Sequence, residues 1–255
     1  MPAKSLLLVC SLLSMLALVA CGGGDGGGTL VTTVSPGGIW GGTDSATGLQ
    51  VKGIVDESGQ FHFIRSDLAQ FVGTANTMGN SLSANFEGFS QVGTTFEDGS
   101  THGTGTLTGT VSERSSLALT YQFTTDAGAA SSGTLNLSYS TLYDLDSSLA
   151  AISGNYTDAT SNDTVSVSGS GAVTSQDPVT LCVVNGQISV INSMYNAYSV
   201  TYAFANCTGT SAVLNGVQFT GLATLNNSNP AQLIIAVTGA VGTTELALVL
   251  TLNHQ

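Results

Sequence analysis

Apolar and polar residues alternate along most of the chain after residue 34, and a period of two predicts β-strands with one apolar face and one polar face. Helical periodicity is not seen in this part of the sequence. The clearest alternating sets are Leu82-Ala84-Phe86, Leu117-Leu119-Tyr121-Phe123, Leu135-Leu137-Tyr139, Tyr198-Val200-Tyr202-Phe204 and Leu246-Leu248-Leu250-Leu252.

Short clusters of turn-forming residues separate these sets. They lie at 57–59, 97–99, 126–128, 185–186 and 215–216, and each contains a glycine or asparagine that tolerates a positive φ. Their spacing favours hairpin-connected antiparallel barrels or sandwiches. Outer-membrane barrels are the competing interpretation, but the strand ends lack aromatic girdles. The predicted fold class is therefore all-β.

A faint internal repeat divides this part of the chain. GGIWGGTDSATG at 37–48 is echoed by ISGNYTDATSND at 152–163, which places Trp40 over Tyr156 at a shift of 116 residues. The same shift carries the set at 82–86 onto 198–202. The repeat predicts two tandem small β lobes, the first at 35–148 and the second at 149–255.

The N-terminus has the pattern of a targeting segment. Lys4 is followed by an almost wholly apolar run at 6–18 that is short for a membrane span. Its end, Leu18-Val19-Ala20-Cys21, resembles the lipobox of bacterial lipoproteins. That resemblance implies a signal peptide at 1–20, lipidation of Cys21, and, because glycine rather than aspartate follows, sorting to the outer membrane. An ordinary secretory signal with an incidental cysteine is the alternative.

The glycine-rich segment after Cys21 predicts a flexible tether at 21–34, between the lipid and the first lobe.

The charge balance is strongly acidic. Lysine and arginine number 4 and acidic residues 16, and loss of Lys4 with the leader would take the net charge from −12 to −13. We expect no nucleic-acid partner, because no basic stripe is available to contact phosphates. A protein partner is expected to be basic.

Two cysteines remain after loss of Cys10 and acylation of Cys21. Cys182 and Cys207 form one possible disulfide in an oxidising compartment. Such a bridge would stabilise the fold by about 3 to 4 kcal/mol in the loop-entropy model. A metal site is not expected, because neither cysteine has a second ligand at suitable spacing.

Reactive side chains are sparse, and no catalytic motif is found. The acidic clusters that could bind a cation or act as paired carboxylates are Glu97-Asp98 with His102, Asp144 with Asp146, and Asp158 with Asp163. We interpret all three as solvated loops. His62 lies between Phe61 and Phe63 and is expected to face solvent. The protein is therefore predicted to be non-enzymatic and to need no cofactor.

Gly38-Ile39-Trp40 resembles the G-x-W entry of lipocalin-type barrels, in which the tryptophan closes the barrel floor. Gly154-Asn155-Tyr156 stands at the same place in the second lobe. Together with the lipobox and tether, two such lobes resemble the bilobed surface lipoproteins of Gram-negative bacteria, of the transferrin-binding protein B and factor H-binding protein type. The resemblance implies a lipid-anchored outer-membrane protein that recognises a protein partner.

Two alternatives stay open. One lobe could be a calyx that carries a small hydrophobic ligand, with Trp40 and Tyr156 as candidate binding residues. The protein could instead inhibit a basic, lysozyme-like hydrolase of the envelope. Other aromatic candidates for lining the lobes are Phe61, Phe63, Phe86 and Tyr121 in the first, and Tyr198, Tyr202, Phe204 and Phe219 in the second.

Overall fold

The computed structural model describes residues 32–242 and 244–255. The predicted signal peptide and the predicted lipidation site Cys21 lie outside the described residues. Within the described part, no helix is long and apolar enough to cross a membrane.

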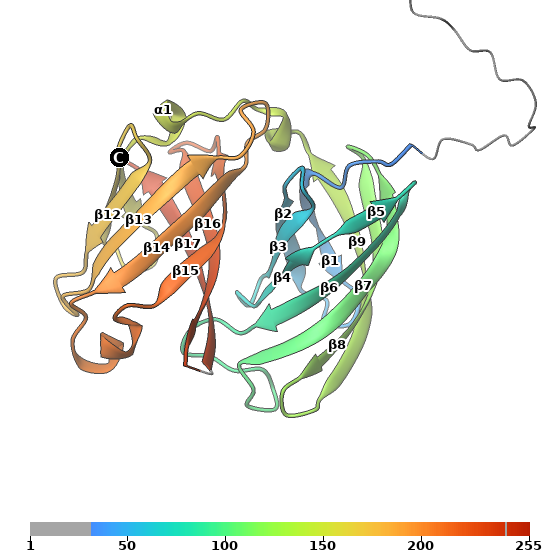
Figure 1. Ribbon diagram of the computed structural model, residues 1–255, viewed down its shortest axis with the longest axis horizontal. Helices are drawn as coiled ribbons and strands as arrows, with labels where there is room; N and C mark the ends of the chain where they lie inside the picture. Colours follow the sequence, from blue (N-terminus) through green and yellow to red (C-terminus); the bar gives the residue numbers. More distant parts are fainter. Residues whose placement is uncertain (1–31, 243) are drawn as a thin grey trace, which may run out of the picture. The chain divides into compact units, whose positions relative to one another are not determined.

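The described chain folds into two closed eight-stranded antiparallel β-barrels in tandem (Figure 1). The prediction of two tandem antiparallel β lobes is thus confirmed. Consecutive strands pair throughout barrel 2, and the first strand of each barrel also pairs with the last.

Barrel 1 is closed by the pairing of β4 with β6, and β5 adds an extra short strand beside β6. Its strands are β1 (Gly38–Asp44), β2 (Gln50–Val55), β3 (Gln60–Arg65), β4 (Gln70–Thr74), β5 (Asn76–Met78), β6 (Ser81–Phe89), β7 (His102–Ser112), β8 (Ser116–Thr125) and β9 (Ala130–Ser140).

Barrel 2 follows a linker that holds η1 (Thr141–Asp144) and α1 (Leu149–Ile152). Its strands are β10 (Gly154–Asp158), β11 (Thr164–Val167), β12 (Ala172–Gln176), β13 (Val183–Val190), β14 (Tyr198–Ala205), β15 (Gln218–Asn226), β16 (Gln232–Val241) and β17 (Thr244–His254), with η2 (Gly209–Leu214) between β14 and β15.

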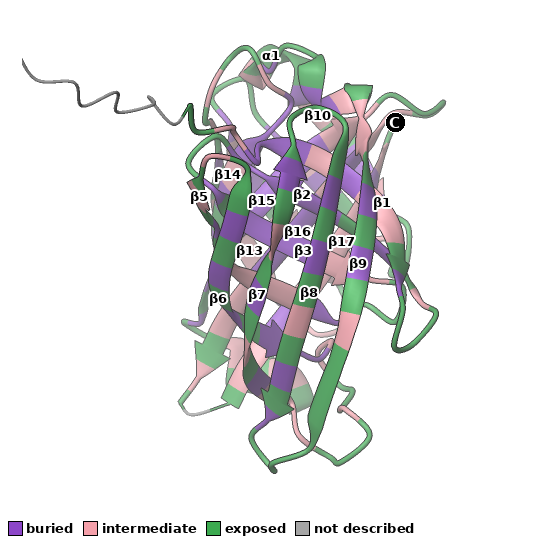
Figure 2. Ribbon diagram, turned by 90° about the vertical axis from the view of Figure 1, so that its right-hand side faces the viewer, coloured by how far each residue is buried: buried purple, intermediate pink, exposed green. Residues whose placement is uncertain are grey.

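The apolar positions of the alternating sequence face the barrel interior, and the polar positions face solvent. On β6, Leu82, Ala84 and Phe86 point into the core of barrel 1, while Ser81 and Ser83 are exposed. Figure 2 shows the same alternation of buried and exposed positions along β7 and β8. Burying one face of each strand is what stabilises a closed barrel in water.

The turn predicted at 185–186 is wrong, because Asn185 and Gly186 lie within β13. Gly186 is paired with Tyr202 across the ladder, and a Cβ there would come within 2.5 Å of the Tyr202 side chain. The glycine therefore permits close cross-strand packing, not a chain reversal.

The repeat seen in the sequence matches the structure element by element. Leu82, Ala84 and Phe86 on β6 face the core of barrel 1, and Tyr198, Val200 and Tyr202 on β14 face the core of barrel 2. The sets at 117–119 on β8 and 233–235 on β16 correspond in the same way. The two barrels thus use the same pattern of inward positions.

Each barrel has a floor closed by one aromatic residue on its first strand. The Trp40 indole N–H donates to the Pro36 carbonyl at 3.1 Å, and the Tyr156 hydroxyl donates to the Ile152 carbonyl at 2.9 Å. Both acceptors lie four residues upstream, and both aromatic side chains are almost wholly buried. The two floors are therefore built in the same way.

The last strand of each barrel covers this aromatic residue. Tyr139 on β9 packs edge-on against Trp40, with ring centroids 5.3 Å apart. His254 on β17 packs edge-on against Tyr156 at 5.0 Å.

His62 is buried, so the expectation that it faces solvent is wrong. Its neighbour Gln70 is also buried and donates through its amide to the Val237 and Leu248 carbonyls of barrel 2 at 3.3 and 2.7 Å. His62 Nδ1 lies 3.4 Å from the Gln70 side-chain oxygen. Burial lowers the pKa of His62 to about 4, so the ring is neutral at pH 7.

Substituting Gly38 with alanine should destabilise barrel 1, because a Cβ there would lie 2.7 Å from the Trp40 ring. We expect a loss of about 1 to 3 kcal/mol in the free energy of unfolding, measured by urea denaturation. Gly41→Ala is the matched control on the same strand, since nothing lies within 4 Å of its added Cβ. Equal effects of the two substitutions would contradict this account of the floor.

Candidate functional site

The interiors of the two barrels are filled to different extents. Barrel 1 keeps a space of only about 40 Å³, because Phe61, Phe63, Phe71, Phe86 and Phe123 crowd its centre. Barrel 2 keeps a mainly apolar cavity of about 210 Å³. The apolar side chains that line this cavity are Val165, Val173, Val184, Val200, Tyr202, Phe204, Leu214, Ile235, Leu250 and Leu252.

The cavity opens at the end of barrel 2 away from the Tyr156 floor, and three loops form its mouth. The turn after β10 contributes Ser161, the loop after β12 contributes Thr180, and η2 contributes Ser211. Thr208 donates from its backbone and its hydroxyl to the Thr180 carbonyl. Two of these loops are therefore joined at the mouth.

A disulfide joins the same two loops. Cys182 and Cys207 are bonded, as the sequence predicted, and Cys182 lines the cavity. The bridge spans 25 residues of chain. It therefore stabilises the mouth of the cavity as well as the fold.

Tyr202 lines this cavity and carries a buried hydroxyl. Tyr202 is only 5% exposed, and its hydroxyl has no hydrogen-bond partner among the described residues. Its ring is held between Phe219, with centroids 5.4 Å apart, and Phe204 at 5.5 Å. Burial, together with the charge of Asp158, raises the pKa of Tyr202, so the phenol stays protonated.

Asp158 lies at the end of β10 and lines the same cavity. Its Oδ1 accepts from the backbone N–H groups of Thr160 and Ser161, both at 2.8 Å. No described residue donates to its Oδ2, and the side chain is buried, with 6% of the residue exposed. The expectation of a solvated loop is wrong for Asp158, because the turn after it folds back over the carboxylate.

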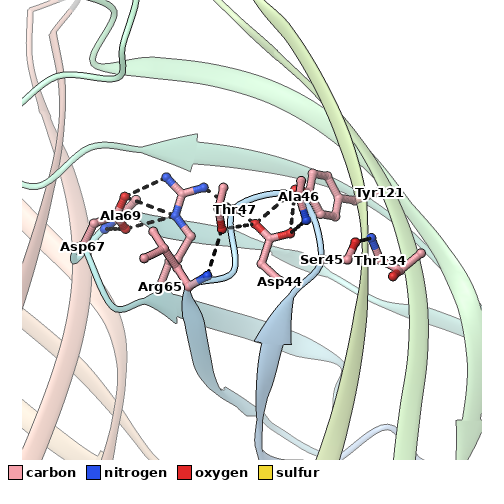
Figure 3. A network of polar contacts seen from close by, with 10 residues as sticks. Asp44, Ser45, Ala46, Thr47, Arg65, Asp67, Ala69, Tyr121 and Thr134 are labelled. Atoms are coloured by element: carbon pink, nitrogen blue, oxygen red, sulfur yellow. Dashed lines mark hydrogen bonds and ion pairs between the residues drawn. The ribbon is translucent and has the colours of Figure 1, made fainter.

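Asp44 occupies the matching place at the end of β1 in barrel 1, and Figure 3 shows its surroundings. The Ala46 N–H donates to Asp44 Oδ1 at 3.0 Å, and so does the Tyr121 hydroxyl at 2.9 Å. Arg65 lies 3.9 Å from Asp44 Oδ2 and is bonded to Asp67 at 2.7 Å. Barrel 1 therefore supplies its own cation to this buried carboxylate.

The pKa values in this network follow from these contacts. Burial acts to lower the pKa of Arg65, but the hydrogen bonds and charge of Asp67 and the charge of Asp44 outweigh it and raise the pKa. Burial and the hydrogen bond to Asp44 raise the pKa of Tyr121 to about 12. Arg65 is therefore charged and Tyr121 neutral at pH 7.

The other acidic clusters have local partners. Asp98 accepts from the Thr125 hydroxyl and the Ser100 N–H, while His102 pairs with Asp126 at 3.1 Å, so Asp98 and His102 bind different partners. Asp144 contacts Arg114, and Asp146 is exposed. In the described part of the chain, no group of three or more His, Cys, Asp or Glu side chains is spaced to hold a metal ion.

The candidate ligand residues Trp40 and Tyr156 lie at the barrel floors and do not line these cavities. Of the aromatic candidates in the second lobe, Tyr202 and Phe204 line the cavity, and Tyr198 and Phe219 belong to the surrounding core. Sequence reasoning missed the valine lining. The only local signal for it was the presence of apolar valines at Val165, Val173 and Val184 in short polar strands.

A separate, more open hollow of about 730 Å³ lies against the outer face of barrel 1. Most of its lining is neutral and polar and includes Gln60, Asn85, Thr106 and Gln122, joined by Thr220 and Thr238 of barrel 2.

No known protein-family model matches the chain, and no curated protein matches it in sequence.

Replacing Tyr202 with phenylalanine should leave the unliganded protein as stable as the wild type, or more stable by up to about 3 kcal/mol, because it removes a buried hydroxyl that has no partner. Tyr156→Phe is the matched control, since it removes a hydroxyl that donates to Ile152. It should cost about 1 kcal/mol. Thermal and urea denaturation measure both, and a larger loss for Tyr202→Phe would show that its hydroxyl is already satisfied.

Proposed function

We propose that this protein is a non-enzymatic binding protein of the bacterial envelope, and that barrel 2 binds a small, largely apolar molecule in its interior. The observation that supports this proposal is the mainly apolar cavity of about 210 Å³, which is lined by Tyr202, a residue whose buried hydroxyl has no partner among the described residues. Ligand sites commonly combine an apolar lining with a few buried polar groups that fix orientation.

The cavity limits the size of the ligand. Drug-sized molecules occupy pockets of about 300 to 1,000 Å³, whereas a dry cavity of about 150 Å³ is enough to bind benzene. The ligand of barrel 2 is therefore small. Barrel 1 does not share this role, because its aromatic side chains leave space for water at most.

The proposal includes a lipid anchor on Cys21 and an outer-membrane location. The lipobox ending at Cys21 and the glycine-rich residues after it support this part. A lipid-anchored carrier could hold its ligand close to the envelope while the tether lets the barrels move.

Recognition of a protein partner is the second candidate function. Three aliphatic side chains at the mouth of barrel 2 face solvent: Val179 is 86% exposed, Val213 62% and Leu181 47%. Exposed apolar side chains beside a binding site are suited to contact a partner protein. The net charge of −12 favours a basic one, and a basic envelope hydrolase, which would be inhibited, is one such partner.

Hexanol tests the ligand proposal, because it is small, neutral and mostly apolar. Titration calorimetry on the purified protein should show saturable binding of one hexanol per chain. Val200→Phe should abolish binding, since Val200 points into the cavity. Thr201→Phe is the matched control on the outer face of the same strand and should bind normally.

Tyr202→Phe keeps this test interpretable if Val200→Phe fails to fold, and it should weaken binding severalfold by removing a hydrogen bond. Hexanol that does not bind the wild type, or that binds equally to Val200→Phe, would overturn the ligand proposal.

The anchor proposal is tested by metabolic labelling with a clickable fatty acid, followed by fractionation of the envelope. The wild type should carry label and sediment with outer membranes, whereas Cys21→Ser should carry none. Cys10→Ser, which changes a cysteine inside the predicted leader, should be labelled like the wild type. Wild-type protein without label would refute lipidation.

A further inference from the structure

We infer that the ligand of barrel 2 carries a positively charged ammonium group on its apolar body. This inference rests on the proposed binding function and names the chemical class of the ligand. The inference is based on a comparison of the two barrels. Each barrel buries a carboxylate, and the two differ in the groups that compensate its charge.

Both barrels bury a carboxylate at the end of the first strand. Asp44 is 3% exposed and Asp158 is 6% exposed. In the turn that follows each, Asp44 accepts the Ala46 N–H and the Thr47 hydroxyl, and Asp158 accepts two backbone N–H groups. Such turns hold the carboxylate in place. A buried carboxylate still needs compensation for its charge.

Barrel 1 provides that compensation from its own side chains. The Arg65 guanidinium lies beside Asp44 and over the Phe71 ring, 5.5 Å from the ring centroid. The Tyr121 hydroxyl donates to the same carboxylate. Carboxylate, aromatic face and phenol together form an environment suited to a cation, and here the cation belongs to the protein.

Barrel 2 has the same three kinds of group but no cation of its own. Asp158 has a free Oδ2, Phe204 and Tyr202 supply aromatic surface, and the Tyr202 hydroxyl lacks a partner. None of the described residues that line the cavity is lysine, arginine or histidine. A bound ammonium could donate to Asp158 Oδ2 and to the Tyr202 oxygen, and so take the place that Arg65 has in barrel 1.

The other charged residues around the cavity also favour a cationic ligand. Asp163 and Asp177 also line it. Hydrogen bonds from Thr180 and Val179 lower the pKa of Asp177, which keeps it ionised at pH 7. An anionic ligand such as a fatty acid would meet three carboxylates without a compensating cation. The site therefore discriminates against acids and in favour of amines.

Hexylamine, hexanol and hexanoate test this inference, because they share one alkyl chain and differ in the charge of the head group. Titration calorimetry at pH 7 on the purified full chain should give an affinity for hexylamine about tenfold higher than for hexanol. Hexanoate should bind more weakly than hexanol.

Asp158→Asn is the decisive variant. The asparagine oxygen can still accept the N–H groups of the turn, so the fold should be kept while the charge is lost. Hexylamine should then bind within about threefold of hexanol. Asp146→Asn removes one negative charge from the exposed linker and should leave the preference for hexylamine unchanged.

The outcomes separate the two proposals. Hexanol that binds as tightly as hexylamine, or a preference for hexylamine that survives Asp158→Asn, would overturn the inference and leave the binding function intact. Absence of binding by all three compounds would overturn the binding function itself.

Discussion

A buried carboxylate at the end of the first strand constrains both barrels, because its charge must be compensated wherever water is excluded. In barrel 1, Arg65 and Tyr121 provide that compensation, and the aromatic core leaves only about 40 Å³ of space. In barrel 2, Asp158 has no cation beside it, and about 210 Å³ stays open. One architecture therefore yields one barrel with a packed interior and a second barrel that keeps an interior cavity.

The opposite end of each barrel follows a common plan. Trp40 and Tyr156 each donate to a carbonyl four residues upstream, and each is covered by an aromatic ring of the last strand. These ring contacts join the first and last strands, which also pair through their backbones and so close each barrel. The mouth loops of barrel 2 can then differ from those of barrel 1 without loss of the fold. The two barrels thus share the construction of the floor and differ at the mouth.

Alternation of apolar residues predicted strands such as β6, β8, β9, β14 and β17, because side-chain direction in a strand depends only on position along it. The internal repeat predicted the tandem lobes. Predictions failed where a distant segment decides the environment. Asn185-Gly186 has the composition of a turn, yet Gly186 lies in a strand because Tyr202 packs against it. His62 lies on the outward side of β3 but is buried near the Gln70 contact with barrel 2. The size of the cavity depends on the summed side-chain volumes of eight strands. A local sequence pattern therefore cannot predict it.

The polar groups at the mouth of barrel 2 cost stability when no ligand is bound. A buried hydroxyl without a partner costs about 1 to 3 kcal/mol, and a buried carboxylate without a cation adds to that. The Cys182–Cys207 bridge joins the loop after β12 to the segment after β14 at the mouth of barrel 2, and a cross-link over 25 residues contributes about 3 to 4 kcal/mol in the loop-entropy model. The two quantities are of similar size. The disulfide can therefore offset the cost of burying the unpartnered Tyr202 hydroxyl and the Asp158 charge, and the proposed ammonium ligand would reduce that cost directly.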